Sequence, residues 1–261
     1  MNVLPPALIA LLEQVPASCE QQVLDTVQRT HDDVLRAVAE CCRLSLDGFA
    51  PVKVVPGAPG VLRWLALPGV NWPPLLQFEA EDGPPQVENA GIEDLLGRYL
   101  LTRDDAQTDE RAANPAGIEL YWRNIGLVAT TLKVTVWDLT IVVLAHEVAH
   151  EYTHLGADLD GQRWLTPRFS RASSTATEAL AQYLCEQALQ AMTRDHPMAL
   201  DAFRRLLTIQ SPIYTSYMKW PAMREGAESV RRALLLMRQI EPDTPGAFFE
   251  VLTGLRLPSR V

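Results

Sequence analysis

The sequence predicts an α+β fold with a small mixed or antiparallel sheet and a mainly helical C-terminal part. Three observations lead to this prediction: helical spacing of apolar residues over most of residues 135–255, short apolar runs separated by Pro and Gly in residues 49–85, and strand-like alternation at residues 117–122. Of the 261 residues, 48% are hydrophobic and 21% are charged, which is typical of a globular protein and excludes a disordered or collagen-like chain.

The first hundred residues mix helical and strand-like patterns. Residues 4–12 are apolar and begin with two prolines, which suit the first turn of a short helix. Apolar residues recur at threes and fours through residues 17–46, predicting one long amphipathic helix. Residues 92–101 return to helical spacing. Three short apolar runs between these segments are interpreted as strands: 52–55, 61–67 and 75–78.

The rest of the chain is mainly helical in pattern. The expected helices are residues 135–154, 173–193, 198–209, 222–240 and 246–255. No connection has the composition of a flexible linker, so we expect one compact unit. Within it, an N-terminal region (1–100) packs on a core region (101–195), and a helical subdomain (196–261) follows.

Composition also restricts where the protein works. No apolar run reaches the roughly eighteen residues that a membrane-spanning helix needs, and no Lys or Arg precedes residues 4–12 as in a signal peptide. The cysteines lack a CxxC spacing, as in proteins of a reducing compartment. They are Cys19, Cys41, Cys42 and Cys185. We therefore expect a cytoplasmic protein without a membrane segment.

Charge is distributed unevenly around a formal net charge of −9. Residues 1–160 hold 10 lysines and arginines against 23 acidic residues, whereas residues 161–261 hold 13 against 9. The basic excess of the C-terminal part is interpreted as a solvated helical surface, with a partner surface as the alternative.

The most informative feature is the run His146-Glu147-Val148-Ala149-His150 in an otherwise apolar helical segment. Residues four apart lie on one helix face, so both histidines can direct a ring nitrogen at one zinc ion, at about 2.0–2.1 Å. Glu147 can contact a water on that ion and accept its proton without occupying a coordination position. The spacing therefore predicts a Zn²⁺ site, with histidines hydrogen-bonded inside a core as the alternative.

A catalytic zinc needs a third protein ligand, and Glu178 is the favoured candidate. It lies near the start of the expected helix 173–193, and an antiparallel neighbouring helix can bring its carboxylate to the two histidines. Thr175 and Glu178 also form a capping-box pattern, in which Glu178 would bind a backbone amide instead.

Three other residues are alternative ligands. His154 lies about 12 Å along the helix from His146, so it can share the ion only if the helix breaks after His150. Asp158 and Asp160 follow a helix end expected at Gly156, in a sequence that is also typical of a plain turn.

Two strings together resemble a known family. Leu144 to His154, followed by Glu178-Ala179-Leu180-Ala181-Gln182-Tyr183, is similar to the gluzincin branch of the zinc metallopeptidases and, within it, to the ImmA/IrrE-like family. The resemblance covers roughly residues 117–190. Gln182 stands where Asn is commoner, and residues 1–100 show nothing that aligns with the family.

The resemblance implies a zincin-like metallopeptidase fold, with the 117–122 strand as the edge strand beside the metal-binding helix. It implies His146, His150 and Glu178 as zinc ligands and Glu147 as general base. His154 would then support the ligands or mark the helix end. It further implies an intracellular endopeptidase, often one that cuts a DNA-binding regulator in stress, mobile-element or phage-response circuits.

Such a hydrolase also needs a group that stabilises the oxyanion. Tyr214 and Tyr217, in the segment downstream of the metal-binding helices, are the leading candidates, and His196 is another. Packing of the helical part is the alternative role for each of these side chains.

A function of another class stays open on the sequence alone. The chain could be a non-catalytic regulatory or binding protein on a zincin scaffold, contacting nucleic acid or a protein partner through basic C-terminal helices that carry Arg204-Arg205 and Arg231-Arg232. Only 3 lysines accompany 20 arginines and no dense basic run occurs, so a nucleic-acid surface has weak support.

Overall fold

The computed structural model describes residues 5–57, 59–70, 92–93, 95–101, 116–158, 161–170, 172–219 and 227–239. The helices are α1 (Pro6–Glu13), α2 (Ser18–Cys42), α4 (Trp122–Leu132), α5 (Val136–Leu155), α6 (Thr166–Phe169), α7 (Ser174–Ala191), α8 (Ala199–Leu207) and α9 (Ala227–Gln239). The strands and 3₁₀-helices are β1 (Val52–Val55), β2 (Ile92–Glu93), β3 (Gly97–Leu100), β4 (Gly117–Tyr121), η1 (Pro59–Trp64) and η2 (Pro212–Lys219). None of the described helices is long and apolar enough to cross a membrane.

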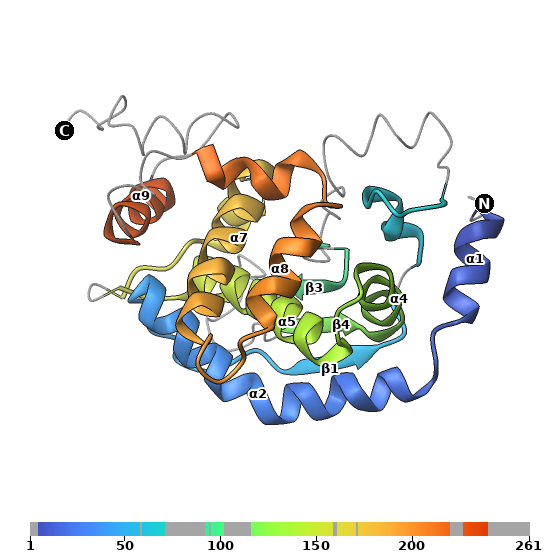
Figure 1. Cartoon of the computed structure of the whole chain (residues 1–261). Coiled ribbons are helices and arrows are strands. Elements are labelled where there is room, and N and C mark those ends of the chain that lie inside the picture. The colour runs from blue at the N-terminus through green and yellow to red at the C-terminus, as the bar shows by residue number, and fades with distance from the viewer. Residues whose placement is uncertain are drawn as a thin grey trace.

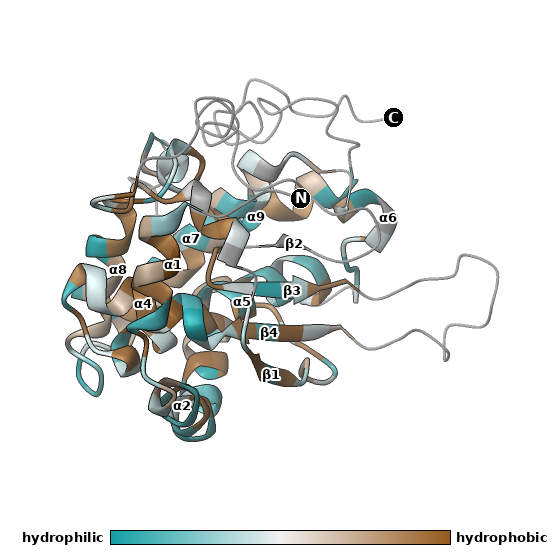
Figure 2. Ribbon diagram, turned by 90° about the vertical axis from the view of Figure 1, so that its right-hand side faces the viewer, coloured by the Kyte–Doolittle hydropathy of each residue, from teal (hydrophilic) through white to brown (hydrophobic). Residues whose placement is uncertain are grey.

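The α+β class is confirmed: the described chain is mostly helical, with one small mixed sheet in the order β1-β4-β3-β2. β1 runs parallel to β4, whereas β3 is antiparallel to both β4 and β2. β4 therefore lies inside the sheet, and the expectation that residues 117–122 form an edge strand is wrong. The sheet lies to one side of the helices, and β1 and β4 are largely apolar (Figure 2).

α5 runs through the middle of the molecule, between the sheet and the helices α2 and α7 (Figure 1). Its start is fixed by Thr135, whose side chain accepts a hydrogen bond of 3.0 Å from the backbone N–H of Asp138, as an N-cap does. From Leu139 to His154 every residue is buried, so apolar residues occur on all sides of this helix and its histidines and glutamates lie inside the core. The helix ends at Leu155, with Gly156 as its C-cap.

α2 joins the N-terminal part to this core. Its buried positions recur at threes and fours, including Val23, Thr30, Val34 and Val38, and the helix packs against α5 and α7. The apolar core is continuous from α1 to α9 across the described residues. α2 therefore packs directly on the helix that carries the two histidines.

Most expected helices are confirmed. Residues 4–12, 17–46, 135–154, 173–193 and 198–209 correspond to α1, α2, α5, α7 and α8, and α9 forms the described part of 222–240. The strand at residues 52–55 is β1, whereas residues 61–67 are not a strand: residues 61–64 belong to the 3₁₀-helix η1, which begins at Pro59. The expected strand 75–78 and helix 246–255 lie outside the described residues.

Residues 92–101 correct the helical prediction made from their spacing. They form β2 and β3, and Gly97–Leu100 pairs with Gly117–Leu120. The sequence patterns did not indicate α4, α6 or η2. Of these, α6 and η2 lie near the candidate site, since Thr166 contacts His154 and Tyr214 lies near His146.

Candidate metal centre

Two antiparallel helices bring the proposed ligands together. Glu178 of α7 meets His146 and His150 of α5, and further along α7 the thiol of Cys185 donates to the carbonyl of Val142, one turn earlier in α5. α7 begins at Ser174, and Ser173 is its N-cap without a side-chain capping bond. Glu178 is therefore not part of a capping box with Thr175, and its carboxylate points to the histidines.

The three donor atoms are spaced as zinc ligands are. Nε2 of His146 lies 3.1 Å from Nε2 of His150 and 3.2 Å from Oε2 of Glu178, and the His150 to Glu178 distance is 3.5 Å. In a tetrahedral site with bonds of about 2.0–2.1 Å, two ligand atoms are about 3.3 Å apart. Two imidazoles and one carboxylate, all at most 3% exposed, therefore form a group that could hold a metal ion.

The electrostatics of Glu178 fit this arrangement. Burial opposes ionisation of its carboxyl group, but the facing imidazoles of His150 and His146 outweigh burial and hold the pKa of Glu178 below its usual range. The carboxyl group is thus ready as an anionic ligand at neutral pH. In a buried site an anion between two imidazoles also attracts a cation strongly.

Glu147 follows His146 directly in α5, and its carboxylate lies between α5 and the sheet. It is fully buried, and its carboxylate approaches β3 so closely that a Cβ on Gly97 would come within 2.7 Å of Oε1. The next residue of α5 after His146 thus carries an acid group that reaches toward the sheet and leaves the ligand positions to the other three side chains.

His154 does not belong to the metal-binding group. The helix continues past it, as expected, and its ring nitrogens bond elsewhere: Nδ1 lies 3.0 Å from the hydroxyl of Tyr99 and Nε2 3.0 Å from Oγ1 of Thr166. Its ring stacks on Phe169 with centroids 4.5 Å apart. His154 is a buried junction between α5, β3 and α6.

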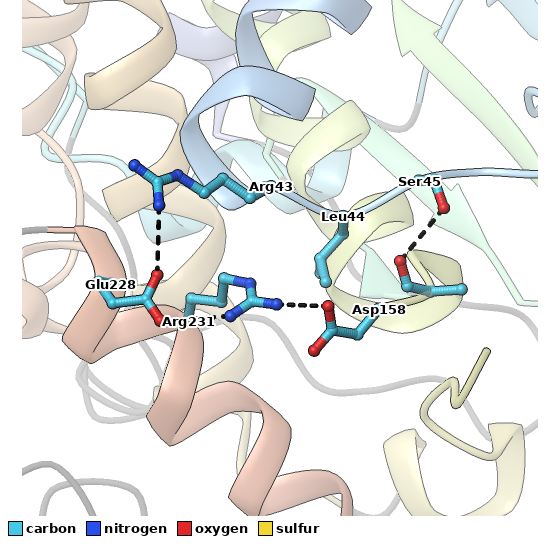
Figure 3. Close-up of a pocket in the computed structure, with 7 residues that line it drawn as sticks. Arg43, Leu44, Ser45, Asp158, Glu228 and Arg231 are labelled. Carbon is cyan, nitrogen blue, oxygen red and sulfur yellow. Dashed lines mark hydrogen bonds and ion pairs between the residues drawn. The ribbon is translucent and has the colours of Figure 1, made fainter. Parts of the chain in front are cut away.

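Asp158 lies away from the donors, in a surface pocket of about 540 Å³ between the ends of α2 and α5 and the side of α9. In Figure 3 its carboxylate faces Arg231, with which it forms an ion pair. Arg231 also contacts Glu228 at 3.3 Å, and Glu228 contacts Arg43 at 3.6 Å. The pocket's charges are thus paired with one another, and Asp158 is not a third ligand. Asp160 lies outside the described residues.

The three candidates for oxyanion stabilisation lie in different places. Tyr214 of η2 is fully buried, and its ring centroid is 6.2 Å from that of His146. The hydroxyl of Tyr217 instead donates to Glu186 at 2.9 Å, on a different part of α7. His196 packs near Trp137, with ring centroids 6.4 Å apart. Of the three, Tyr214 is the one beside the donor group.

Comparisons of the chain with known protein families, with characterised proteins and with solved structures find no match. The arrangement of side chains is therefore the basis for assigning a function.

Three residues near the centre had no place in the sequence prediction. Gly97 and Tyr99 lie on β3, a segment whose helical spacing concealed its strand. Arg238 of α9 is buried, and its guanidinium donates to backbone carbonyls at the end of α5. The alternation of Gly97, Arg98 and Tyr99 is a sequence signal that would have indicated the strand. Nothing in the sequence near Arg238 indicates that it contacts the end of α5.

Proposed function

We propose that this protein is a zinc-dependent endopeptidase in which His146, His150 and Glu178 hold the ion. The observation that carries the proposal is the mutual spacing of three buried donor atoms, 3.1 to 3.5 Å apart. Glu147 follows the ligand His146 directly in α5, and its buried carboxylate lies against Gly97 of β3. The similarity of the two motif strings to the gluzincins supports the same reading.

The chemistry follows from the residue types present. Bound zinc supplies an activated water and a Lewis acid for the carbonyl group of a peptide bond. Glu147 would serve as the proton acceptor of the site and would return a proton to the leaving amine. Tyr214, whose ring centroid lies 6.2 Å from that of His146, would be the hydrogen-bond donor to the oxyanion. The low exposure of the whole group strengthens each of these electrostatic interactions.

The substrate class proposed is a regulatory protein of the cytoplasm, with a DNA-binding regulator as the first candidate. This part of the proposal rests on the resemblance to the ImmA/IrrE-like family. Binding of nucleic acid by the chain itself has less support: Arg205 pairs with Asp201, and Arg231 pairs with Asp158, so two of the four arginines singled out are already engaged.

The substitution Glu147→Gln separates metal binding from chemistry. We expect purified wild-type protein to bind one zinc ion and to hydrolyse an unfolded substrate such as casein. Glu147→Gln should retain the zinc and lose about 10²–10⁴-fold in kcat, because the amide cannot accept the proton. Metal content is measured by elemental analysis and hydrolysis by release of labelled peptides.

The matched control is Glu20→Gln, which makes the same chemical change at an exposed position of the first turn of α2. It should leave both readouts unchanged. Hydrolysis that survives in Glu147→Gln at the wild-type rate, or a zinc-loaded wild type that cleaves neither casein nor any regulator offered, would count against a peptidase.

A further inference from the structure

One face of strand β3 is turned toward the metal-binding helix. Burial alternates along the strand: Gly97 and Tyr99 are buried, and Arg98 and Leu100 are partly exposed. Arg98 points to the other face, where its guanidinium pairs with Glu119 at 2.7 Å. Gly97 and Tyr99 therefore meet α5 together, two residues apart.

Gly97 lies against the carboxylate of Glu147. A Cβ atom at this position would lie 2.7 Å from Oε1 of Glu147, which is closer than Cβ atoms approach in proteins, and 3.1 Å from Cδ, which is a tight contact, so the Glu147 carboxylate would have to move. Its third neighbour, the backbone oxygen of Glu119, would be 3.0 Å away. The carboxylate of the proposed general base thus occupies space that every other residue type would fill.

Tyr99 is the neighbour of His150 on the same strand face. The two rings are nearly parallel, with an interplanar angle of 14° and centroids 6.4 Å apart. The hydroxyl of Tyr99 is bonded to Nδ1 of His154, one turn further along α5. The aromatic ring is thereby held beside a proposed ligand by a contact at each end.

The strand itself is firmly placed. The carbonyl of Leu96 accepts a hydrogen bond of 2.8 Å from the N–H of Tyr121. The carbonyl of Leu95 accepts a hydrogen bond of 3.0 Å from the buried side-chain amide of Asn124. β3 is also paired along its length with β4. Because these carbonyls belong to the two residues before Gly97, contacts with β4 and α4 hold the backbone of Gly97 in place.

We propose that Gly97 and Tyr99 are positioning residues of the metal centre: the missing Cβ of Gly97 gives the Glu147 carboxylate its place, and the ring of Tyr99 holds His150. The proposal deepens the proposed function and rests on it for the catalytic role of Glu147. Its geometric part stands on the contacts of β3 with α5.

A double-mutant cycle on the full chain tests the role of Gly97. Thermal unfolding midpoints are measured without metal for wild type, Gly97→Ala, Glu147→Asp and the double variant. Gly97→Ala should lower the midpoint by about 3–8 °C, since overpacking strains the core. In the Glu147→Asp background, Gly97→Ala should lower the unfolding midpoint by at most half as much, because the shorter acidic side chain leaves more room for the added methyl group.

Gly117→Ala is the matched control, because this glycine lies in the same sheet and its Cβ would meet the flexible side chain of Leu100 at 3.2 Å. It should shift the midpoint by less than Gly97→Ala. A loss from Gly97→Ala that is equal in both backgrounds would overturn the role of Gly97, whether or not the protein is a peptidase.

The functional consequence is measured on the zinc-loaded protein. Gly97→Ala should bind one zinc ion with an affinity within about threefold of wild type, and should hydrolyse casein with kcat at least tenfold lower and KM unchanged, since only Glu147 is displaced. An unchanged kcat overturns the positioning role. If the unfolding cycle shows coupling between Gly97 and Glu147 but wild type does not hydrolyse the substrate, the contact between the two residues is supported and the proposed peptidase function is refuted.

Tyr99 is tested through metal affinity, which needs no substrate. Tyr99→Leu removes the ring beside His150 and should weaken zinc binding about tenfold, whereas Tyr99→Phe keeps the ring and should stay within about threefold of wild type. Competition with a chelator of known zinc affinity gives both values. Tyr99→Leu that binds zinc as tightly as wild type overturns the role of Tyr99.

Discussion

His154 is buried and makes three side-chain contacts, and this environment sets its protonation state. Its two ring nitrogens bond to the hydroxyl groups of Tyr99 and Thr166, and its ring lies flat on Phe169. Burial lowers the pKa of His154 to about 3, and the positive charge of Arg238 works in the same direction. The imidazole is therefore neutral in the folded protein throughout the physiological range.

This depressed pKa predicts an acid-sensitive contribution to stability. Unfolded His154 binds a proton near pH 6.5, whereas the folded residue does so only near pH 3. Between these values the unfolded state binds more protons, so the free energy of unfolding falls as pH falls, by up to about 1.4 kcal/mol per pH unit. His154→Gln, which can keep both hydrogen bonds, should lose this dependence. Urea unfolding of the metal-free protein at pH 7.5, 6 and 5 measures it.

The comparison must be with wild type at each pH, because another residue acts in the opposite direction. Burial raises the pKa of Glu151 to about 7, although the amide of Ala50 donates to its carboxylate at 2.7 Å and opposes the rise. Its contribution to stability is lost as pH rises from about 4.5 to 7. The partly exposed His196, changed to Gln, is the control. Identical pH slopes for wild type and His154→Gln would show that His154 does not titrate as described.

At the scale of the element, the end of α5 depends on a helix far along the chain. Arg238 of α9 is 6% exposed and donates to the carbonyls of Gly156 at 2.6 Å and Thr153 at 2.8 Å. It also reaches the carbonyls of Gln162 at 3.1 Å and Tyr152 at 3.2 Å. A cation thus satisfies carbonyl groups that a helix C-terminus leaves open and complements the helix dipole.

Removing this side chain should destabilise the fold strongly. Arg238→Met keeps the apolar stem but leaves buried carbonyls without their donor, at a cost of about 3 kcal/mol or more. Arg238→Lys should recover only part, because an ammonium group cannot match the planar fork of the guanidinium. Arg232→Met, at an exposed position of the same helix, is the control and should change little. Chemical unfolding gives the energies, and a loss below 1 kcal/mol would refute the role of Arg238.

The helices of the metal centre were predictable because their signals are local. α5 has a capping residue, an apolar run and two histidines four apart, and all of these lie within twenty residues. β2 and β3 were missed because the apolar residues at 92, 95, 96, 99 and 100 fit a helical spacing equally well. Residues 97–100 form a strand and not a helix because they pair with β4, about twenty residues later in the chain. For the same reason the sequence did not indicate that Gly97 and Tyr99 of β3 lie next to Glu147 and His150.

At the scale of the whole molecule, three arginines of the basic C-terminal part contact segments from the acidic part of the chain. Arg238 is buried against α5, Arg231 pairs with Asp158 from the acidic part, and Arg163 pairs with Asp47. Counting charges along the sequence could show the asymmetry but not these pairings across it. These three arginines therefore connect the basic and the acidic parts of the chain.

A metal ion would connect the molecule in a similar way, because it would join α5 to α7 through residues 32 positions apart in the sequence. A ligand that binds only the folded state at a thousandfold excess over its Kd adds about 4 kcal/mol to stability. We therefore expect zinc to raise the unfolding midpoint of the metal-free protein by about 8–16 °C. Glu178→Ala should abolish the shift, whereas Gln182→Ala, one turn further along α7 and bonded to Gln210, should preserve it. A full zinc shift in Glu178→Ala would remove Glu178 from the ligand set, and the absence of any shift in wild type would refute the metal centre itself.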